Sequence, residues 1–309
     1  MDFTNTTTYF NQTSSLTVRS NVTFNETAPG YRLVVFITTV LLTNAAGAVA
    51  NVILLLAMTI HRPLRKSSSC PLIAQCIAVD LYITTVAVPI VVIPFFLGPS
   101  LQLSEDFCRY EALSVYLFYS CGMFSEAVVA FHRLIATVLP HHFVFFKRRS
   151  SVIGLLLISW VVAAVTCTFP TLGIGTRVVP ATRGCNVAPQ GNPASLTVSV
   201  AIGYFFPTIF MGCCYVTVLT RTSQELRKRQ GKSRSLVRRM EISRTLFFSF
   251  LWHCVTVYPP LIVMGHFSEQ YAESLSLKLA IMWLGSCFSA INPVSGIRNS
   301  SRSNQDLAV

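Results

Sequence analysis

Seven long apolar segments run through this chain of 309 residues and leave little sequence outside them. A helix needs roughly 20 apolar residues to cross a hydrocarbon core of about 30 Å, and each segment is long enough. Charged residues make up only 12% of the chain, whereas a soluble domain has about 25%. We therefore expect an all-α membrane protein, a seven-transmembrane helix bundle with the segments Tyr31–Ile60, Pro71–Leu97, Cys108–Val138, Val152–Gly173, Ser195–Thr220, Ser243–His266 and Leu275–Ile297.

The segments divide the chain into a head of residues 1–30, a transmembrane domain of residues 31–297 and a short tail of residues 298–309. With the N-terminus outside, 18 of the 24 Lys and Arg lie at or beyond the inner ends of the segments. Basic loops stay in the cytoplasm, so we expect a cytoplasmic C-terminus and a basic third cytoplasmic loop at residues 221–242, which also suits contact with anionic membrane lipids. No nucleic acid is expected as a partner, because the basic run lacks interleaved aromatic residues for base stacking.

The extracellular head is rich in acceptor sequons for N-glycosylation, a modification made on the outer side of a membrane protein. Four of them, at Asn5, Asn11, Asn21 and Asn25, fall within the head and predict a glycosylated, disordered segment. A polar disordered tail without sugars is the plainer alternative. Since no apolar run precedes Tyr31, we expect the first segment to serve as its own membrane anchor rather than follow a cleaved signal peptide.

The chain has ten cysteines, a number that could form a disulfide framework, but the predicted topology argues against one. Eight lie within the segments or at their inner edges, where a cysteine is usually a small buried apolar side chain. Only Cys108 and Cys185 face the oxidising side, where disulfides persist. We therefore expect these two to form a disulfide bond.

Few ionisable or amide side chains lie inside the segments. A charge at the bilayer centre costs on the order of 2.5–3.5 kcal/mol on insertion scales, so each should face the bundle interior. Asn51, Asp80 and Asn292 can meet near mid-membrane, with Ser289 one turn before Asn292. Such a cluster either only holds helices together, at about 0.6 kcal/mol for each hydrogen bond, or also carries function. The remaining buried ionisable residues are Glu126 and His253.

In their order and spacing these residues resemble the rhodopsin-like (class A) G-protein-coupled receptors, across essentially the whole membrane part of the chain. Cys108 opens the third segment, Arg133 closes it 25 residues later, and Cys185 lies in the loop after the fourth. The chain looks like a divergent, orphan-like or chemosensory-like member. The other matching positions are Asn51, Asp80-Leu81, Trp160, Pro207, Tyr215, Pro259 and Asn292-Pro293.

The resemblance implies signalling rather than catalysis, so we expect no enzyme. In the family, an external ligand makes the sixth segment swing outward at the cytoplasmic face, and a heterotrimeric G protein binds in the cleft that opens. The resemblance thus implies a plasma-membrane receptor with Arg133 and Tyr215 as inner-end switch residues. It also implies a polar water site in which Asp80 holds an allosteric sodium ion, the one candidate cofactor or metal; its residues are Asn51, Asp80, Glu126, Ser289 and Asn292.

The chain departs from the family pattern at the switch itself. His132 stands before Arg133 where the family has an acid, and Arg239 stands where many members have a second acid. Two restraints on Arg133 are therefore missing, and we expect raised ligand-independent activity. Glu126 occupies a usually apolar position one turn below Gly122. It either adds a polar group to the sodium site or is protonated and bonded to a neighbouring helix.

The ligand is inferred mostly by exclusion. Val115 stands where amine receptors have an aspartate and Ser286 where opsins have the retinal-binding lysine, so neither a monoamine nor retinal is expected. The rest of the outer half is apolar and aromatic, which suits a neutral or weakly anionic small molecule. The candidate ligand-binding residues are Tyr116, Tyr119, Ser120, Met264, Lys278, Met282 and Trp283.

Three further readings remain open. Ile291-Asn292-Pro293 is similar to olfactory-type receptors of the same fold, although the basic third loop argues against an odorant receptor. A multi-span transporter would show charges along a path or two related halves, and neither is visible. The last residues, Asp306–Val309, are a candidate edge strand for a PDZ partner.

Overall fold

The structure of the protein is a computed structural model that describes residues 30–61, 67–97, 101–181, 184–190, 198, 200–228, 234–267, 274, 276, 277 and 279–290. Within these ranges it has six helical segments long and apolar enough to cross a membrane, and the shorter apolar helix Leu279–Ala290. Together they form the all-α seven-helix bundle that the sequence predicts. The elements are α1 (Tyr31–Ile60), α3 (Cys70–Tyr82), α4 (Val88–Leu97), α5 (Glu105–Val138), α6 (Pro140–Phe146), α7 (Arg149–Thr171), β1 (Gly175–Ala181), β2 (Gly184–Gln190), α9 (Phe206–Lys228) and α10 (Arg234–His266).

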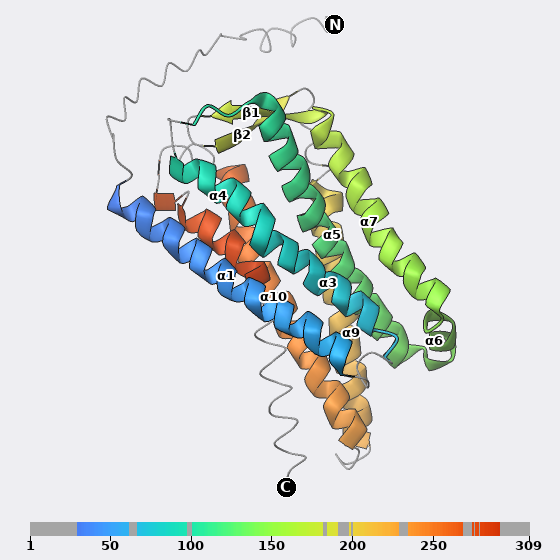
Figure 1. The fold of residues 1–309 in the computed structure, drawn as a ribbon. Helices are drawn as coiled ribbons and strands as arrows, with labels where there is room; N and C mark the ends of the chain where they lie inside the picture. Colours follow the sequence, from blue (N-terminus) through green and yellow to red (C-terminus); the bar gives the residue numbers. More distant parts are fainter. Residues whose placement is uncertain are drawn as a thin grey trace, which may run out of the picture.

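The helices lie side by side in an elongated bundle, with α5 in contact with α3, α7 and α9 (Figure 1). Strands β1 and β2 pair as an antiparallel hairpin that packs against α5 at one end of the bundle. We call this the hairpin end. The opposite end, where α5 finishes and α6 turns back toward α7, we call the Arg133 end.

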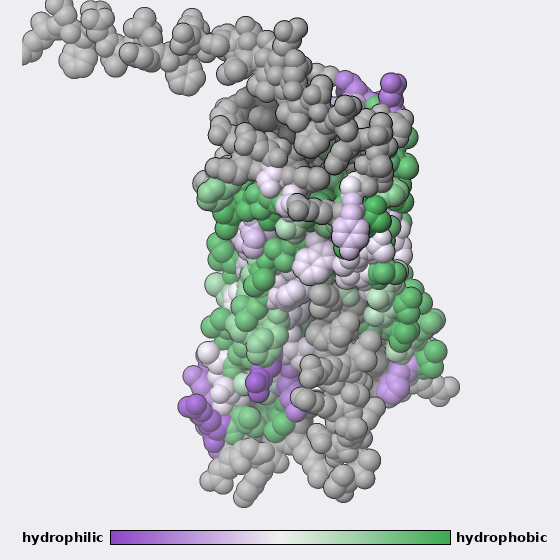
Figure 2. Space-filling model, turned by 90° about the vertical axis from the view of Figure 1, so that its left-hand side faces the viewer, coloured by the Kyte–Doolittle hydropathy of each residue, from purple (hydrophilic) through white to green (hydrophobic). Residues whose placement is uncertain are grey.

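The outer surface of the bundle suits lipid. Large apolar side chains are exposed along the helices, among them Leu42, Ile53, Leu157 and Ile209. Figure 2 shows hydrophobic residues over the middle of the visible face and hydrophilic residues gathered near its ends. A soluble protein rarely exposes so large an apolar area, and the pattern fits a hydrocarbon belt between two polar margins.

Helix α5 begins three residues before the predicted segment, and its start has an identifiable cause. The Ser104 hydroxyl accepts a hydrogen bond from the Phe107 amide at 3.1 Å, which satisfies one free donor of the first turn. Glu105 and Asp106 lie in that turn, where negative charge stabilises the positive end of the helix dipole. The polar cap thus extends the helix beyond its apolar core.

The segment predicted as a basic loop at residues 221–242 is helical on both sides. Helix α9 continues to Lys228 and α10 begins at Arg234. Hydropathy marks where the membrane ends, whereas a helix ends only where its backbone bonding stops. Since Gln224, Glu225 and Leu226 are good helix formers, the helix runs on past the apolar boundary.

Two membrane helices contain a π-helical turn just before a proline. The turn Ile83–Ala87 joins α3 to α4 ahead of Pro89, and the turn Ala201–Phe205 precedes α9 and Pro207. Proline lacks an N–H and its ring clashes with the carbonyl four residues earlier, and a wider turn relieves both problems. These prolines therefore reshape their helices without ending them.

The predicted disulfide is confirmed. Cys108 and Cys185 are bonded, with 5.5 Å between their Cα atoms. The bond ties the start of α5 to β2, so the hairpin is fixed over the end of the bundle. Sequence reasoning did not predict the hairpin, although Val178, Val179 and Val187 are residues that favour strands.

Gly47 provides a direct test of the packing of α1. A Cβ atom added there would lie 2.5 Å from Cα of Ala290, whereas one added at Gly154 of α7 would meet nothing within 4 Å. We expect Gly47→Ala to destabilise the protein by about 1–3 kcal/mol through overpacking. Gly154→Ala, the matched control, should be neutral or stabilising by up to about 1 kcal/mol. Thermal unfolding in detergent measures both, and equal shifts for the two variants would contradict the close approach of α1 to Ala290.

Candidate functional site

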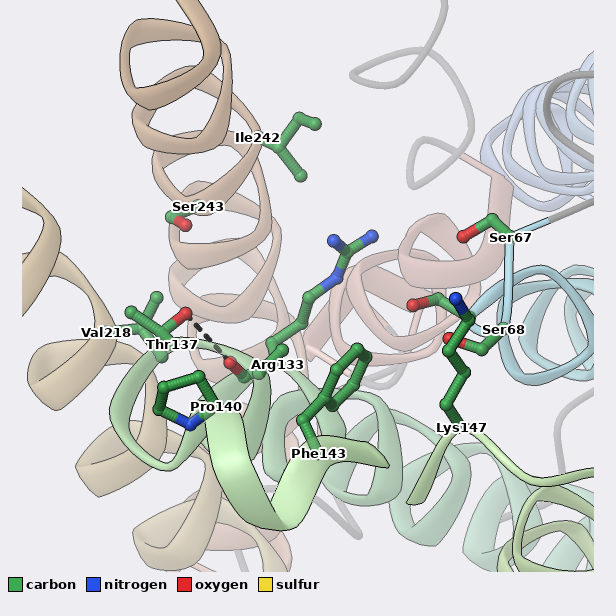
Figure 3. A pocket seen from close by; sticks show the side chains of 12 residues that line it. Ser67, Ser68, Arg133, Thr137, Pro140, Phe143, Lys147, Val218, Ile242 and Ser243 are labelled. Carbon is green, nitrogen blue, oxygen red and sulfur yellow. Dashed lines mark hydrogen bonds between the residues drawn. The ribbon is translucent and has the colours of Figure 1, made fainter. Parts of the chain in front are cut away.

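A cavity of about 430 Å³ opens at the Arg133 end of the bundle. Residues from the start of α3, the end of α5, α6, α9 and α10 surround it (Figure 3). Several elements distant in sequence therefore meet around one space. The lining residues are Ser67, Ser68, Ser69, Arg133, Ala136, Thr137, Pro140, Phe143, Lys147, Val218, Ile242 and Ser243.

Arg133 extends from the last turns of α5 into this cavity (Figure 3). Its backbone carbonyl accepts a hydrogen bond from the Thr137 hydroxyl at 2.9 Å. Val218 of α9 and Ile242 of α10 line the same space. The guanidinium thus lies where α5, α9 and α10 converge, which is the place that a switch between these helices requires.

His132 is 1% exposed and connects α5 to two other elements. Its Nδ1 lies 3.3 Å from the Ser69 hydroxyl at the start of α3. Its ring meets that of Phe143 in α6 edge to face, with 5.1 Å between centroids. His132 therefore holds α3 and α6 against α5, a packing role that the sequence did not reveal.

The other two predicted switch residues lie on α9 and α10. Tyr215 is buried in an apolar cluster with Met123, Ala127 and Met211. Its ring is 5.9 Å from that of Phe250 in α10, so it lies between α5, α9 and α10. Arg239 belongs to α10, but its side chain lies outside the described residues.

Inside the bundle, Glu126 of α5 faces His253 of α10. The Glu126 Oε2 and His253 Nδ1 atoms are 3.9 Å apart, and the side chains are 16% and 2% exposed. The ring of Phe288 packs edge-on against His253, with 4.4 Å between centroids. This geometry favours the reading in which Glu126 contacts a neighbouring helix, because its carboxylate lies within ion-pair distance of a side chain of α10.

The predicted mid-membrane cluster is brought together in part. Asn51 donates from Nδ2 to the carbonyl of Ser289 at 3.5 Å, which joins α1 to the helix Leu279–Ala290. Asp80 is also buried. Among the described residues, Asn51 Oδ1 and Ser289 Oγ have no hydrogen-bond partner. Buried oxygens of this kind usually bind water or a hard cation, so the donor set fits the predicted sodium ion. Asn292 lies outside the described residues.

The candidate ligand residues toward the hairpin end differ in how deeply they are buried. Tyr116 and Tyr119 are partly buried, and Ser120 is buried with its hydroxyl 3.8 Å from the Cys167 sulfur. Met282 packs against the apolar core, while Trp283 is 40% exposed on the surface of its helix. The side chains of Met264 and Lys278 lie outside the described residues.

Sequence reasoning missed Glu111, a buried carboxyl in the first part of α5. It is 8% exposed, and its Oε2 has no hydrogen-bond partner among the residues that the structure describes. It shares a helix face with Ser114 and Phe118. The Ser114 hydroxyl is hydrogen-bonded to the hydroxyl of Tyr82 in α3, and the Phe118 ring stacks on the Tyr82 ring. Glu111 therefore lies on the side of α5 that faces α3. An acid within the third apolar segment was the signal available.

Comparison with known proteins completes this evidence. The family model described as 7 transmembrane receptor (rhodopsin family) matches residues 50–295. A melatonin receptor type 1B of Homo sapiens is 22% identical over 273 residues, which cover 84% of this chain and 73% of that receptor. G-protein coupled receptor 183-A of Danio rerio is 24% identical over 200 residues, or 60% of this chain and 53% of its own length.

A tyramine receptor of Caenorhabditis elegans is 22% identical over 196 residues, and the match spans 63% of this chain but only 42% of that relative. The family match covers most of the chain and includes every described helix from α3 to the helix Leu279–Ala290. It agrees with the seven-helix bundle, the disulfide and the position of Arg133. The chain belongs to the rhodopsin family of seven-transmembrane receptors and is a multi-pass protein of the plasma membrane.

Proposed function

We propose that this receptor passes an extracellular small-molecule signal to a heterotrimeric G protein that binds at the Arg133 end. The cavity between α5, α6, α9 and α10 supports this proposal, because Arg133 lines it together with residues of α10. Helix α10 is the sixth span, which is expected to move away from α5. The family mechanism, in which the sixth span moves outward, would widen this same space. Ligand binding then acts by favouring one of two helix arrangements.

The distribution of charge supports a cytoplasmic Arg133 end. Lys147, Arg148 and Arg149 are exposed beside α6, and α9 ends with Arg227 and Lys228. Basic residues flanking membrane helices are retained in the cytoplasm. The hairpin end, with its disulfide, then faces outside, where such bonds persist.

For the ligand we propose a neutral or weakly anionic small molecule near Tyr116 and Tyr119. One relative is named a tyramine receptor and another a melatonin receptor, so the relatives do not select one ligand. Val115 offers no carboxylate to an amine at the position where amine receptors carry one. Sodium at Asp80 and a PDZ partner at the C-terminus stay as predictions.

Nucleotide exchange tests the proposal. Membranes that contain the unliganded receptor should accelerate binding of a non-hydrolysable GTP analogue to at least one of a panel of purified G proteins. Membranes with Arg133→Gln at equal surface expression are the control and should not. No acceleration with any G protein, or equal acceleration by both membranes, would contradict G-protein coupling through the Arg133 end.

We expect the unusual residue before Arg133 to raise ligand-independent activity. Replacing His132 by Asp restores a carboxylate next to the guanidinium, and an ion pair of about 1 kcal/mol would lower basal exchange roughly fivefold. His132→Asn serves as the control, because asparagine has nearly the same shape as aspartate but carries no charge. Both variants lose the contacts of His132 to Ser69 and Phe143. Equal basal exchange rates for the Asp and Asn variants would contradict the expectation that the missing acid raises ligand-independent activity.

The contact between Glu126 and His253 should hold α10 against α5 in the unliganded state. A double-mutant cycle with Glu126→Gln and His253→Phe should give a coupling of about 1 kcal/mol in thermal unfolding, and each single variant should raise basal exchange. Glu105 and Arg109 are also 3.9 Å apart but exposed, so the cycle of Glu105→Gln with Arg109→Gln should give only about 0.3–0.5 kcal/mol. Additive effects at Glu126 and His253 would show that this contact does not couple the helices.

A further inference from the structure

We propose that the cavity at the Arg133 end binds a phosphate ester anion. Its source is either the headgroup of an inositol phospholipid of the inner leaflet or a soluble phosphate. The lipid source rests on the proposed cytoplasmic orientation of this end, whereas the binding chemistry does not.

The charge of the cavity is the first argument. Two cationic side chains, Arg133 and Lys147, line it, and none of the twelve described lining residues is acidic. In Figure 3 the guanidinium of Arg133 and the ammonium of Lys147 both point toward the segment that carries Ser67 and Ser68. A guanidinium and an ammonium that converge on one space are the groups that proteins use for phosphate recognition.

Hydroxyl groups provide the second argument. Ser67 and Ser68 line the cavity, and a serine hydroxyl can donate its proton to a phosphate oxygen. The start of α3 follows directly on Ser69, so the positive end of a helix dipole adds to the field. The lining therefore combines cations, neutral donors and helix polarity of one sign.

At two positions the sequence lacks an acid that the family pattern has near the switch arginine. The position before Arg133 is His132, whose buried ring is directed to Ser69 and Phe143. Arg239 replaces the second acid that many family members carry. Because neither position supplies a carboxylate, a bound anion would complete the charge balance that acids provide elsewhere in the family.

The size of the cavity agrees with such a ligand. About 430 Å³ is within the range of roughly 300–1,000 Å³ that small-molecule sites occupy. Val218 and Ile242 form an apolar side, against which a sugar ring or the upper part of a lipid can pack. An anion held here would bridge the end of α5 to α6 and oppose entry of a G protein into the same space.

Binding is measured without any G protein, so failure of coupling and failure of this site are distinguishable. Fluorescent inositol trisphosphate is titrated into purified receptor in detergent. In parallel, receptor is reconstituted in nanodiscs of phosphatidylcholine alone or with phosphatidylinositol bisphosphate, and bound lipid is counted by native mass spectrometry. If the soluble probe binds, the site accepts soluble phosphates. If only the bisphosphate lipid is retained, the ligand comes from the membrane. Either result supports the site.

The variants separate a built site from general surface charge. Lys147→Gln removes a lining cation, whereas Arg149→Gln removes an exposed cation of the adjacent helix that does not line the cavity. We expect Lys147→Gln to weaken binding about tenfold, as for loss of one charge-assisted hydrogen bond, and Arg149→Gln less than about twofold. Ser68→Ala, a mild change just before α3, should weaken binding about threefold for loss of a neutral bond. Equal losses for the two charge variants, or no binding of either probe, would overturn the proposal.

Discussion

The position of α5 is the constraint on which the rest of the structure depends. This one helix packs against α3, α7 and α9. It contacts the β1–β2 hairpin at one end and α6 at the other. The disulfide from Cys108 fixes its start, and His132 fixes its end to α3 and α6. Since lipid offers no hydrogen bonds, polar side chains inside the bundle must find partners on neighbouring helices, and those of α5 do so on α3 and α10.

Those partners connect α5 to the helix expected to move. Glu126 reaches His253 near mid-membrane, and Tyr215 joins α9 to Phe250 of α10. Further along the same helix, Arg133 enters the cavity that α10 partly closes. Glu126 thus contacts α10 inside the bundle and Arg133 lines a cavity together with α10, so a shift of α10 changes an interior polar contact and the cavity together. Such a linked change is what a two-state receptor requires.

Much of this fold follows from the sequence because hydropathy and membrane thickness determine where helices lie. The bounds of α1 coincide with the predicted segment, and topology alone singled out Cys108 and Cys185. The start of α10 at Arg234, nine residues before the predicted segment, was missed because hydropathy does not record helix ends outside the membrane. The contact of Glu126 with His253 and the inward turn of His132 depend on how helices are rotated against one another. A single sequence does not contain that rotation in readable form.

The most direct test is the distance between α6 and α10 at the Arg133 end. His141 and Glu241 are exposed there and accept spin labels on genetically encoded residues, which avoids the eight free cysteines. Double electron–electron resonance should give a longer distance when the receptor binds nucleotide-free G protein than when it is alone. An unchanged distance in the presence of bound G protein would contradict the account, because α10 would then not open the cavity.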